Sequence, residues 1–314
     1  MADGKWIAGL TPGMPVADAA KAVLAERFAV VRTALPLAAE HASENVEHVH
    51  QLRVGTRRAA AALRVFADAL PGKPAKATRR ALRAIRRAAG DARDWDVFLA
   101  MLPESKAFAA SPAQPALDFL AGYAFGERAA AQARLAEAAA DAGPSFGAQS
   151  EELPDRARAP EGTDAPADFG TLAAQQLGAL LRDLTAGAEA NPTDPAALHA
   201  LRITAKRLRY AIEIFADCFP PALRETVYPA VEQVQELLGV VQDSAVGQER
   251  LAAIRANVGA VMPKQLSRVR KGIDALAKEL RAKVPAGRKA FTKWRKEWLA
   301  LTAALKLEVV AATV

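Results

Sequence analysis

The segment His50-Gln-Leu-Arg53-Val-Gly-Thr-Arg57-Arg58 decides the fold, because a segment of the same pattern, His199-Ala-Leu-Arg202-Ile-Thr-Ala-Lys206-Arg207, follows 149 residues later. The same offset holds beyond the segment without an insertion. It relates Phe66 to Phe215, Gly90 to Gly239, Asp94 to Asp243 and Val97 to Val246. The sequence therefore predicts an internal repeat whose unit is about half of the chain.

Apolar residues recur at helical rather than alternating spacing, and alanine, leucine and arginine are abundant. These features predict an all-α fold made of two helical bundles of similar plan. The predicted helices cover residues 16–41, 45–69, 76–101, 113–140, 168–188, 195–217, 222–256, 263–283 and 287–311. Gly90 and Gly239 predict a break in the third helix of each copy. Asp194 before Pro195 predicts a capped helix start.

The stretch between the two copies is acidic and rich in proline. Residues 143–167 contain four prolines, and residues 137–168 hold eight acidic residues against two basic ones. Such a composition is typical of a solvated, largely disordered linker. We therefore expect a first repeat over 1–142, a linker over 143–167 and a second repeat over 168–314. An alternative is that the acidic segment competes with an anionic ligand for a basic site.

The chain of 314 residues carries a formal net charge of +7. A basic balance favours nucleic acid, phosphate polymers or anionic membranes as partners. The single Cys218 excludes an internal disulfide, and the N-terminal sequence lacks the plan of a signal peptide. Charges interrupt every apolar stretch before it reaches the roughly 20 residues that cross a bilayer. These features predict a soluble, cytoplasmic protein.

At about 100° per residue, each repeated segment places its cations on one face of a helix and its apolar residues on the other. The cationic face holds His50, Arg53, Arg57 and Arg64 in the first copy, and His199, Arg202, Lys206 and Arg209 in the second. The opposite faces, which end in Phe66 and Phe215, are expected to pack in the core. Two matched cationic faces predict a two-walled site for a polyanion.

A further cationic face lies on the next helix of the first copy, formed by Arg79, Arg83, Arg86 and Arg93. Like charges at this spacing cost an isolated helix about 0.2–0.5 kcal/mol per pair, so an anion is expected to neutralise them. The matching positions of the second copy are Tyr228, Glu232, Gln235 and Gln242, which makes the predicted site asymmetric. Lys264, Arg268 and Lys271 lie in a basic run over 264–296, and they either extend the site or form a solvated surface.

The two segments resemble the conserved-histidine α-helical domain (CHAD) family. Its signature is a histidine followed at +3 by arginine and at +7 and +8 by arginine or lysine, on a helix that ends in phenylalanine. The resemblance covers roughly residues 15–311. It implies two four-helix bundles related by pseudo-twofold symmetry, whose motif helices line a basic groove that binds inorganic polyphosphate. Some family members locate to polyphosphate granules.

Carried over by position, the resemblance implies that polyphosphate contacts His50, Arg53, Arg57, Arg58, His199, Arg202, Lys206 and Arg207. Arg64 and Arg209 extend these faces, and the four arginines at 79, 83, 86 and 93 are added from the helix geometry. A phosphate chain beside the histidines is expected to favour their protonated form, and therefore to bind more tightly near pH 6 than near pH 8.

Two enzymatic alternatives remain. Histidines with Asp94 and Asp243 would suit a metal-dependent phosphohydrolase, although the four histidines of the chain form no HExxH pattern. His50 would also suit a phosphoacceptor, because His50-Gln-Leu-Arg53 is similar to the acceptor box of sensor histidine kinases. The favoured prediction is a binding protein with no catalytic residue, metal or cofactor.

Nucleic acid is the stronger rival to polyphosphate, because phosphate contacts alone give affinity. Single-strand binding uses exposed aromatic rings, whereas the motif helices offer only Phe66, Tyr210 and Phe215, two of them on the core face. Trp294 and Trp298, four residues apart among basic residues, would be the aromatic residues of a membrane-binding helix, but aromatic residues at this spacing more often anchor the core of a bundle. We therefore predict no membrane partner.

Overall fold

The computed structural model describes residues 4–109, 113–163 and 165–309. Within these ranges the chain forms eight α-helices and no strand, so the predicted all-α fold is confirmed. The helices are α1 (Val16–Glu40), α2 (Glu47–Val65), α3 (Gly72–Glu104), α4 (Gln114–Glu152), α5 (Phe169–Glu189), α6 (Pro195–Phe215), α7 (Tyr228–Val261) and α8 (Pro263–Val309). None of the helices, as far as they are described, carries an apolar stretch long enough to cross a bilayer.

The helices belong to two compact units that do not follow the order of the sequence. Unit 1 comprises Met1–Leu99, Tyr123–Leu177 and Tyr210–Leu223, and unit 2 comprises Ala100–Gly122, Gly178–Arg209 and Arg224–Val314. The boundaries between the units fall inside helices. As a result, α3, α4, α5 and α6 each contribute residues to both units.

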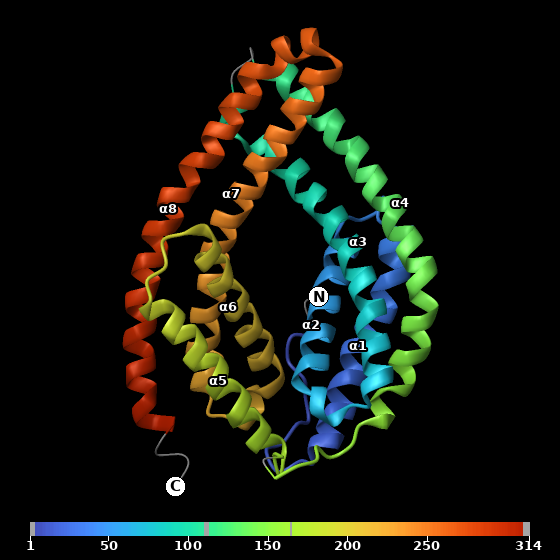
Figure 1. Ribbon diagram of the computed structural model, residues 1–314, viewed down its shortest axis with the longest axis vertical. Helices are drawn as coiled ribbons and strands as arrows, with labels where there is room; N and C mark the ends of the chain where they lie inside the picture. Colours follow the sequence, from blue (N-terminus) through green and yellow to red (C-terminus); the bar gives the residue numbers. More distant parts are fainter. Residues whose placement is uncertain (1–3, 110–112, 164, 310–314) are drawn as a thin grey trace. The chain divides into compact units, whose positions relative to one another are not determined.

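Unit 1 contains a four-helix bundle in which each helix contacts the next one and α4 returns to α1 (Figure 1). Besides the packing of α1 on α2, three contacts close the ring: Arg53 of α2 with Gly90 of α3, Thr78 of α3 with Gln149 of α4, and Phe28 of α1 with Phe146 of α4. The start of α5 and the end of α6 complete its core, because the ring of Phe169 lies 6.2 Å from that of Phe66 and 5.2 Å from that of Phe215.

Unit 2 contains the second four-helix bundle. Its ring of contacts is Gly187 of α5 with Leu201 of α6, His199 of α6 with Gln242 of α7, the long packing of α7 on α8, and Trp298 of α8 with Thr185 of α5. Trp294 and Trp298 are both 1% exposed, and their indole N–H groups donate to the Ala230 carbonyl and the Thr185 hydroxyl. The two tryptophans therefore lie in the core of the bundle, as their spacing predicts.

A local sequence signal places the start of α6 correctly. The Asp194 carboxylate accepts a hydrogen bond of 2.9 Å from the backbone N–H of Ala197, and α6 begins at Pro195. This side chain satisfies one of the N–H groups that have no partner inside the first turn of a helix.

The predicted breaks at glycine and proline are wrong. Helices α3 and α7 run without interruption through Gly90 and Gly239, and α8 is a single helix through Pro285 where two were predicted. Buried side chains flank each position; Leu280 and Phe291, for example, are each 3% exposed on either side of Pro285. Tertiary packing thus outweighs the local cost of the breaker residue. Residues 310–311 of the last predicted helix lie outside the described residues.

The predicted linker at 143–167 also begins too early. Helix α4 continues through Pro144 to Glu152, and Phe146 and Ser150 in this stretch are each 1% exposed. Ser150 accepts a hydrogen bond of 3.0 Å from Arg32 of α1, and Phe146 packs on Phe28. The prediction relied on the acidic, proline-containing composition of the stretch, which does not show that Phe146 and Ser150 face the core.

Candidate functional site

Helix α2 divides into the two faces that the sequence predicts. Its apolar face is fully packed, since Leu52, Ala59, Leu63 and Phe66 are each at most 1% exposed. On the other face His50, Arg53 and Arg57 are half-buried and Arg64 is exposed. The core of unit 1 therefore fixes the orientation of α2 and holds its cations on the opposite face.

Arg53 extends from α2 across α3. Its Nη1 atom donates to the Gly90 carbonyl at 3.0 Å and lies 2.7 Å from an oxygen of the Asp94 carboxylate. A Cβ atom at position 90 would lie 3.5 Å from the same Nη1 atom. Arg53 is thus held against the backbone of α3 by two acceptors, and Asp94 is an ion-pair partner that positions it.

His50 lies among arginines from both helices. Burial lowers the pKa of its imidazole, Glu47 raises it, and Arg93, Arg53 and Arg57 lower it again, with a net shift below the ordinary value of 6.5. These surroundings therefore favour the neutral imidazole over the imidazolium. An anion bound beside these cations would act in the opposite direction and favour the imidazolium.

The arginines of α3 differ in whether they have a partner. Arg79 donates to the Leu63 carbonyl at 2.9 Å, in the last turn of α2, where a cation is favoured by the helix dipole. Arg83, Arg86 and Arg93 make no hydrogen bond or ion pair within the described part of the chain. Burial lowers the pKa of Arg86, and neighbouring Arg83 lowers it further. Arg83 and Arg86 are therefore neighbouring cations, and none of the three arginines has an acidic partner in the described residues.

Arg58 has a different environment from the other motif residues. Its Nε atom donates at 2.8 Å to Glu213, whose side chain is 1% exposed in the core of unit 1. A buried carboxylate of this kind requires its cation, because removing the partner leaves an uncompensated charge. Arg58, for which the family resemblance implies a polyphosphate contact, thus forms an ion pair with Glu213 inside unit 1.

The corresponding surface of unit 2 lies between α6 and α7. Gln242 accepts from His199 Nδ1 at 3.2 Å when that nitrogen carries the proton, and Arg209 lies 3.4 Å from Glu232. Arg202 lies over Gly239, with Nη2 3.6 Å from the place where a Cβ would be, and its buried Nε has no hydrogen-bond partner among the described residues. Lys206 is half-buried and Arg207 is exposed.

The arrangement of Arg202 and Gly239 in unit 2 matches that of Arg53 and Gly90 in unit 1. In both units an arginine of the motif helix lies on a glycine of the following helix, with similar distances of 3.6 Å and 3.5 Å to the absent Cβ. The charge around the two arginines differs, because α7 presents no cation at the positions where α3 presents four.

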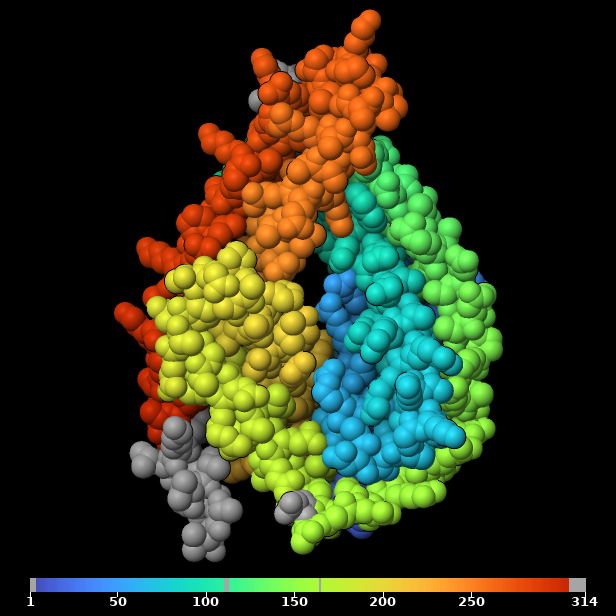
Figure 2. Space-filling view, in the orientation of Figure 1, coloured from blue at the N-terminus to red at the C-terminus, as the bar shows by residue number. Residues whose placement is uncertain are grey.

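The basic run of α8 is a solvated surface in unit 2. Lys264, Arg268 and Lys271 are all exposed, and long side chains project separately from the orange to red surface of α8 (Figure 2). The charged groups of the three side chains make no hydrogen bond or ion pair within the described ranges. The structure does not bring them together with the motif residues of α6.

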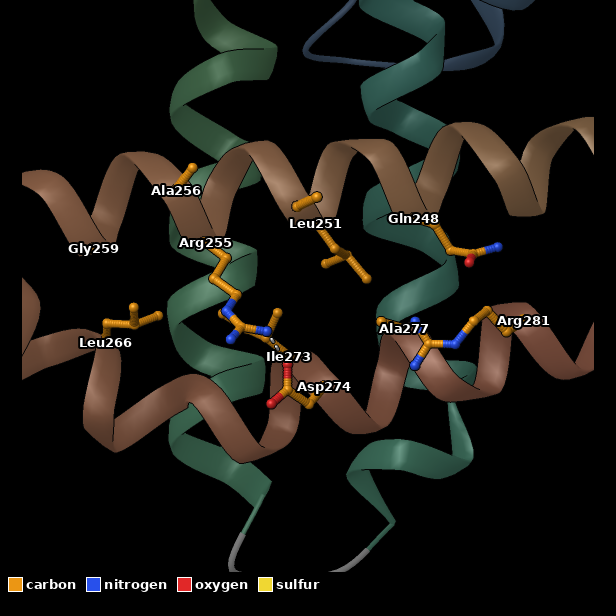
Figure 3. Close-up of a pocket in the computed structure, with 11 residues that line it drawn as sticks. Gln248, Leu251, Arg255, Ala256, Gly259, Leu266, Ile273, Asp274, Ala277 and Arg281 are labelled. Atoms are coloured by element: carbon orange, nitrogen blue, oxygen red, sulfur yellow. Dashed lines mark hydrogen bonds and ion pairs between the residues drawn. The ribbon is translucent and has the colours of Figure 1, made fainter.

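A cavity of about 750 Å³ lies elsewhere in unit 2, between α7 and α8. Leu251 of α7 and Ile273 of α8 line it, and Arg255 of α7 extends to Asp274 of α8 at 2.8 Å (Figure 3). Arg281 lies at the other end. The sequence pattern singled out none of these residues, because only the packing of α7 on α8 brings them together. No three histidine, cysteine or acidic side chains in the described ranges converge to hold a metal ion.

Comparisons with known proteins agree with this architecture. The crystal structure of the CHAD domain from the plant Ricinus communis is similar, with a TM-score of 0.70 and 25% sequence identity over 91% of this chain and 96% of that chain. PptA from Streptomyces chartreusis has the same fold, with a TM-score of 0.69 and 18% identity over 90% of this chain and 99% of that chain. A search of curated proteins gave no match. The family model of the CHAD domain matches residues 22–252, most of the sequence, and the chain therefore belongs to the CHAD domain family.

Proposed function

We propose that this protein binds inorganic polyphosphate without changing it chemically, through the cationic α2–α3 surface of unit 1 and the smaller α6–α7 surface of unit 2. Membership of the CHAD family supports the ligand class that the motif resemblance implies. The observation that carries the proposal is the set of arginines on α3, in which Arg83 and Arg86 are neighbouring cations, Arg93 lies near His50, and none of the three has an acidic partner in the described residues.

The chemistry of the surface suits a phosphate chain. Guanidinium groups offer paired N–H donors that match phosphate oxygens, and each contact adds along a polymer that carries about one charge per unit. The aromatic residues of the motif helices are unsuited to base stacking, since Phe66, Tyr210 and Phe215 are at most 5% exposed. We expect the chain to accumulate with polyphosphate wherever the polymer condenses into granules.

Titration with long-chain polyphosphate, tripolyphosphate and duplex DNA of matched phosphate content, at physiological salt, tests the proposal. Arg53→Ala/Arg202→Ala is expected to weaken polyphosphate binding by roughly tenfold or more, because each lost phosphate contact lowers the affinity. Arg255→Ala/Arg270→Ala removes the same number of charges from the α7–α8 pair and is the matched control. Equal losses in the two variants, or tighter binding of DNA than of polyphosphate, would refute the proposal.

A further inference from the structure

The cations of unit 1 form a single row along α3. Arg79, Arg83, Arg86 and Arg93 are separated by four, three and seven residues, and the position that would complete the helical spacing is Gly90. Arg53 fills this gap, because its guanidinium crosses from α2 and bonds to the Gly90 carbonyl. The row therefore runs Arg79, Arg83, Arg86, Arg53 and Arg93, and the Asp94 carboxylate lies within it, 2.7 Å from Arg53. Figure 2 shows the blue α2 and cyan α3 surfaces adjoining on one face of unit 1.

The row has a definite length. Fourteen residues separate Arg79 from Arg93, which corresponds to about 21 Å along a helix at about 1.5 Å per residue. A single phosphate group can contact one or two of the five guanidinium groups. A linear polyanion that extends along α3 can contact all of them.

Unit 2 has no such row. The positions that match Arg83, Arg86 and Arg93 are Glu232, Gln235 and Gln242. Glu232 already pairs with Arg209 and Gln242 with His199, so two of these groups are engaged by α6. Of the five equivalent positions in unit 2, Arg202 over Gly239 is the only cation.

We infer that the five-arginine row on α3 of unit 1 is the element that selects long polyphosphate chains over short ones. The inference rests on the proposed function and assigns its chain-length specificity to named residues. Repulsion within the row supports it, because Arg83 and Arg86 are adjacent cations of which one is partly buried. Only a ligand that spans the row relieves this repulsion along its whole length.

Exchanging residues between the units tests the inference in the full-length protein. Arg83→Glu/Arg86→Gln gives α3 the residues that α7 carries at the matching positions. Arg80→Glu/Arg87→Gln makes the same change of charge on the same helix, about 100° away, and is the control. All four arginines lack partners in the described residues, so both variants are expected to fold, which circular dichroism and thermal melting would verify.

The row variant is expected to lose roughly tenfold or more in affinity for long-chain polyphosphate, and less than about threefold for tripolyphosphate. The slope of log affinity against log salt for the long chain should fall by about two. The control should change both affinities by less than about threefold. Equal losses in the row variant and the control, or equal losses for both ligands, would overturn the inference. Absence of polyphosphate binding in the unmodified protein would instead refute the proposed function.

Discussion

Burial and three neighbouring arginines each disfavour protonation of the His50 imidazole. They outweigh Glu47 and hold the pKa of the imidazole below its ordinary value. The unfolded chain therefore binds this proton more readily than the folded one, so His50 leaves stability unchanged above pH 6.5 and lowers it as the pH falls below 6.5. A phosphate chain bound beside His50 would raise the pKa and reverse the effect.

Chemical denaturation between pH 7 and pH 5 measures this property. The free energy of unfolding of the unmodified protein is expected to fall more steeply with acidification than that of His50→Gln. In the presence of polyphosphate, the same pH change should tighten binding in the unmodified protein and have a weaker effect in the variant. Identical pH dependence of unfolding in the two proteins would show that the imidazole is not held neutral by its surroundings.

Some features of individual residues could be predicted from the sequence, and others could not. The cationic and apolar faces of α2 follow from helical periodicity, and Asp194 and Pro195 locate a helix start correctly. The bond of Arg58 to Glu213 could not be predicted, because the two residues are 155 apart in sequence and meet only in the core. Periodicity assigns a side chain to a face of its helix but does not identify its partner on another element.

At the scale of helices, glycine has two different roles. A Cβ atom on Gly90 would make an ordinary contact of 3.5 Å with Arg53, whereas a Cβ on Gly272 of α8 would collide with the Cβ of Ala116 on α4. The sequence predicts a helix break at Gly90. In the structure it is an open position of an intact helix.

Two substitutions separate these roles. Gly90→Ala is expected to stabilise the protein by about 0.5–1 kcal/mol, because alanine fits and favours the helix. Gly272→Ala is expected to destabilise it by about 1–3 kcal/mol, because α4 and α8 must move apart. Denaturant unfolding of both variants beside the unmodified protein is the measurement. Destabilisation by Gly90→Ala would mean that α3 depends on glycine at this position.

The long continuous helices were the hardest elements to predict. Proline and glycine change local propensity by about 1–3 kcal/mol, and on this ground breaks were expected near Gly90 and Gly239 and helix ends before Pro144 and Pro285. The core residues on both sides of Pro144 and Pro285 bury enough surface to outweigh that cost. Whether a helix continues thus depends on neighbours that are distant in sequence, and the pattern within one helix does not contain this information.

At the scale of the whole molecule, the two copies of the motif are not two separable proteins. Unit 1 requires residues from the second copy, including Phe169 and Phe215, and unit 2 requires 100–122 from the first. The 149-residue repeat remains a prediction from the sequence, and the compact units do not coincide with its two copies.

Expression of 1–142 and 168–314 as separate fragments tests this dependence. Each fragment is expected to lack a cooperative thermal transition, because each lacks buried residues of its unit. A protease site inserted at 160–163, in an exposed to half-exposed connection outside the helices, is the control. Cleavage there should leave a cooperative transition, since both pieces remain associated. A sharp transition in either isolated fragment would contradict the expectation.

The helices shared between the units also affect how the gene can recombine. Since α3, α4, α5 and α6 each supply residues to both units, a recombination event between the motif copies would leave two incomplete cores instead of two small domains. The two motif copies are therefore expected to be inherited together, although their charges differ.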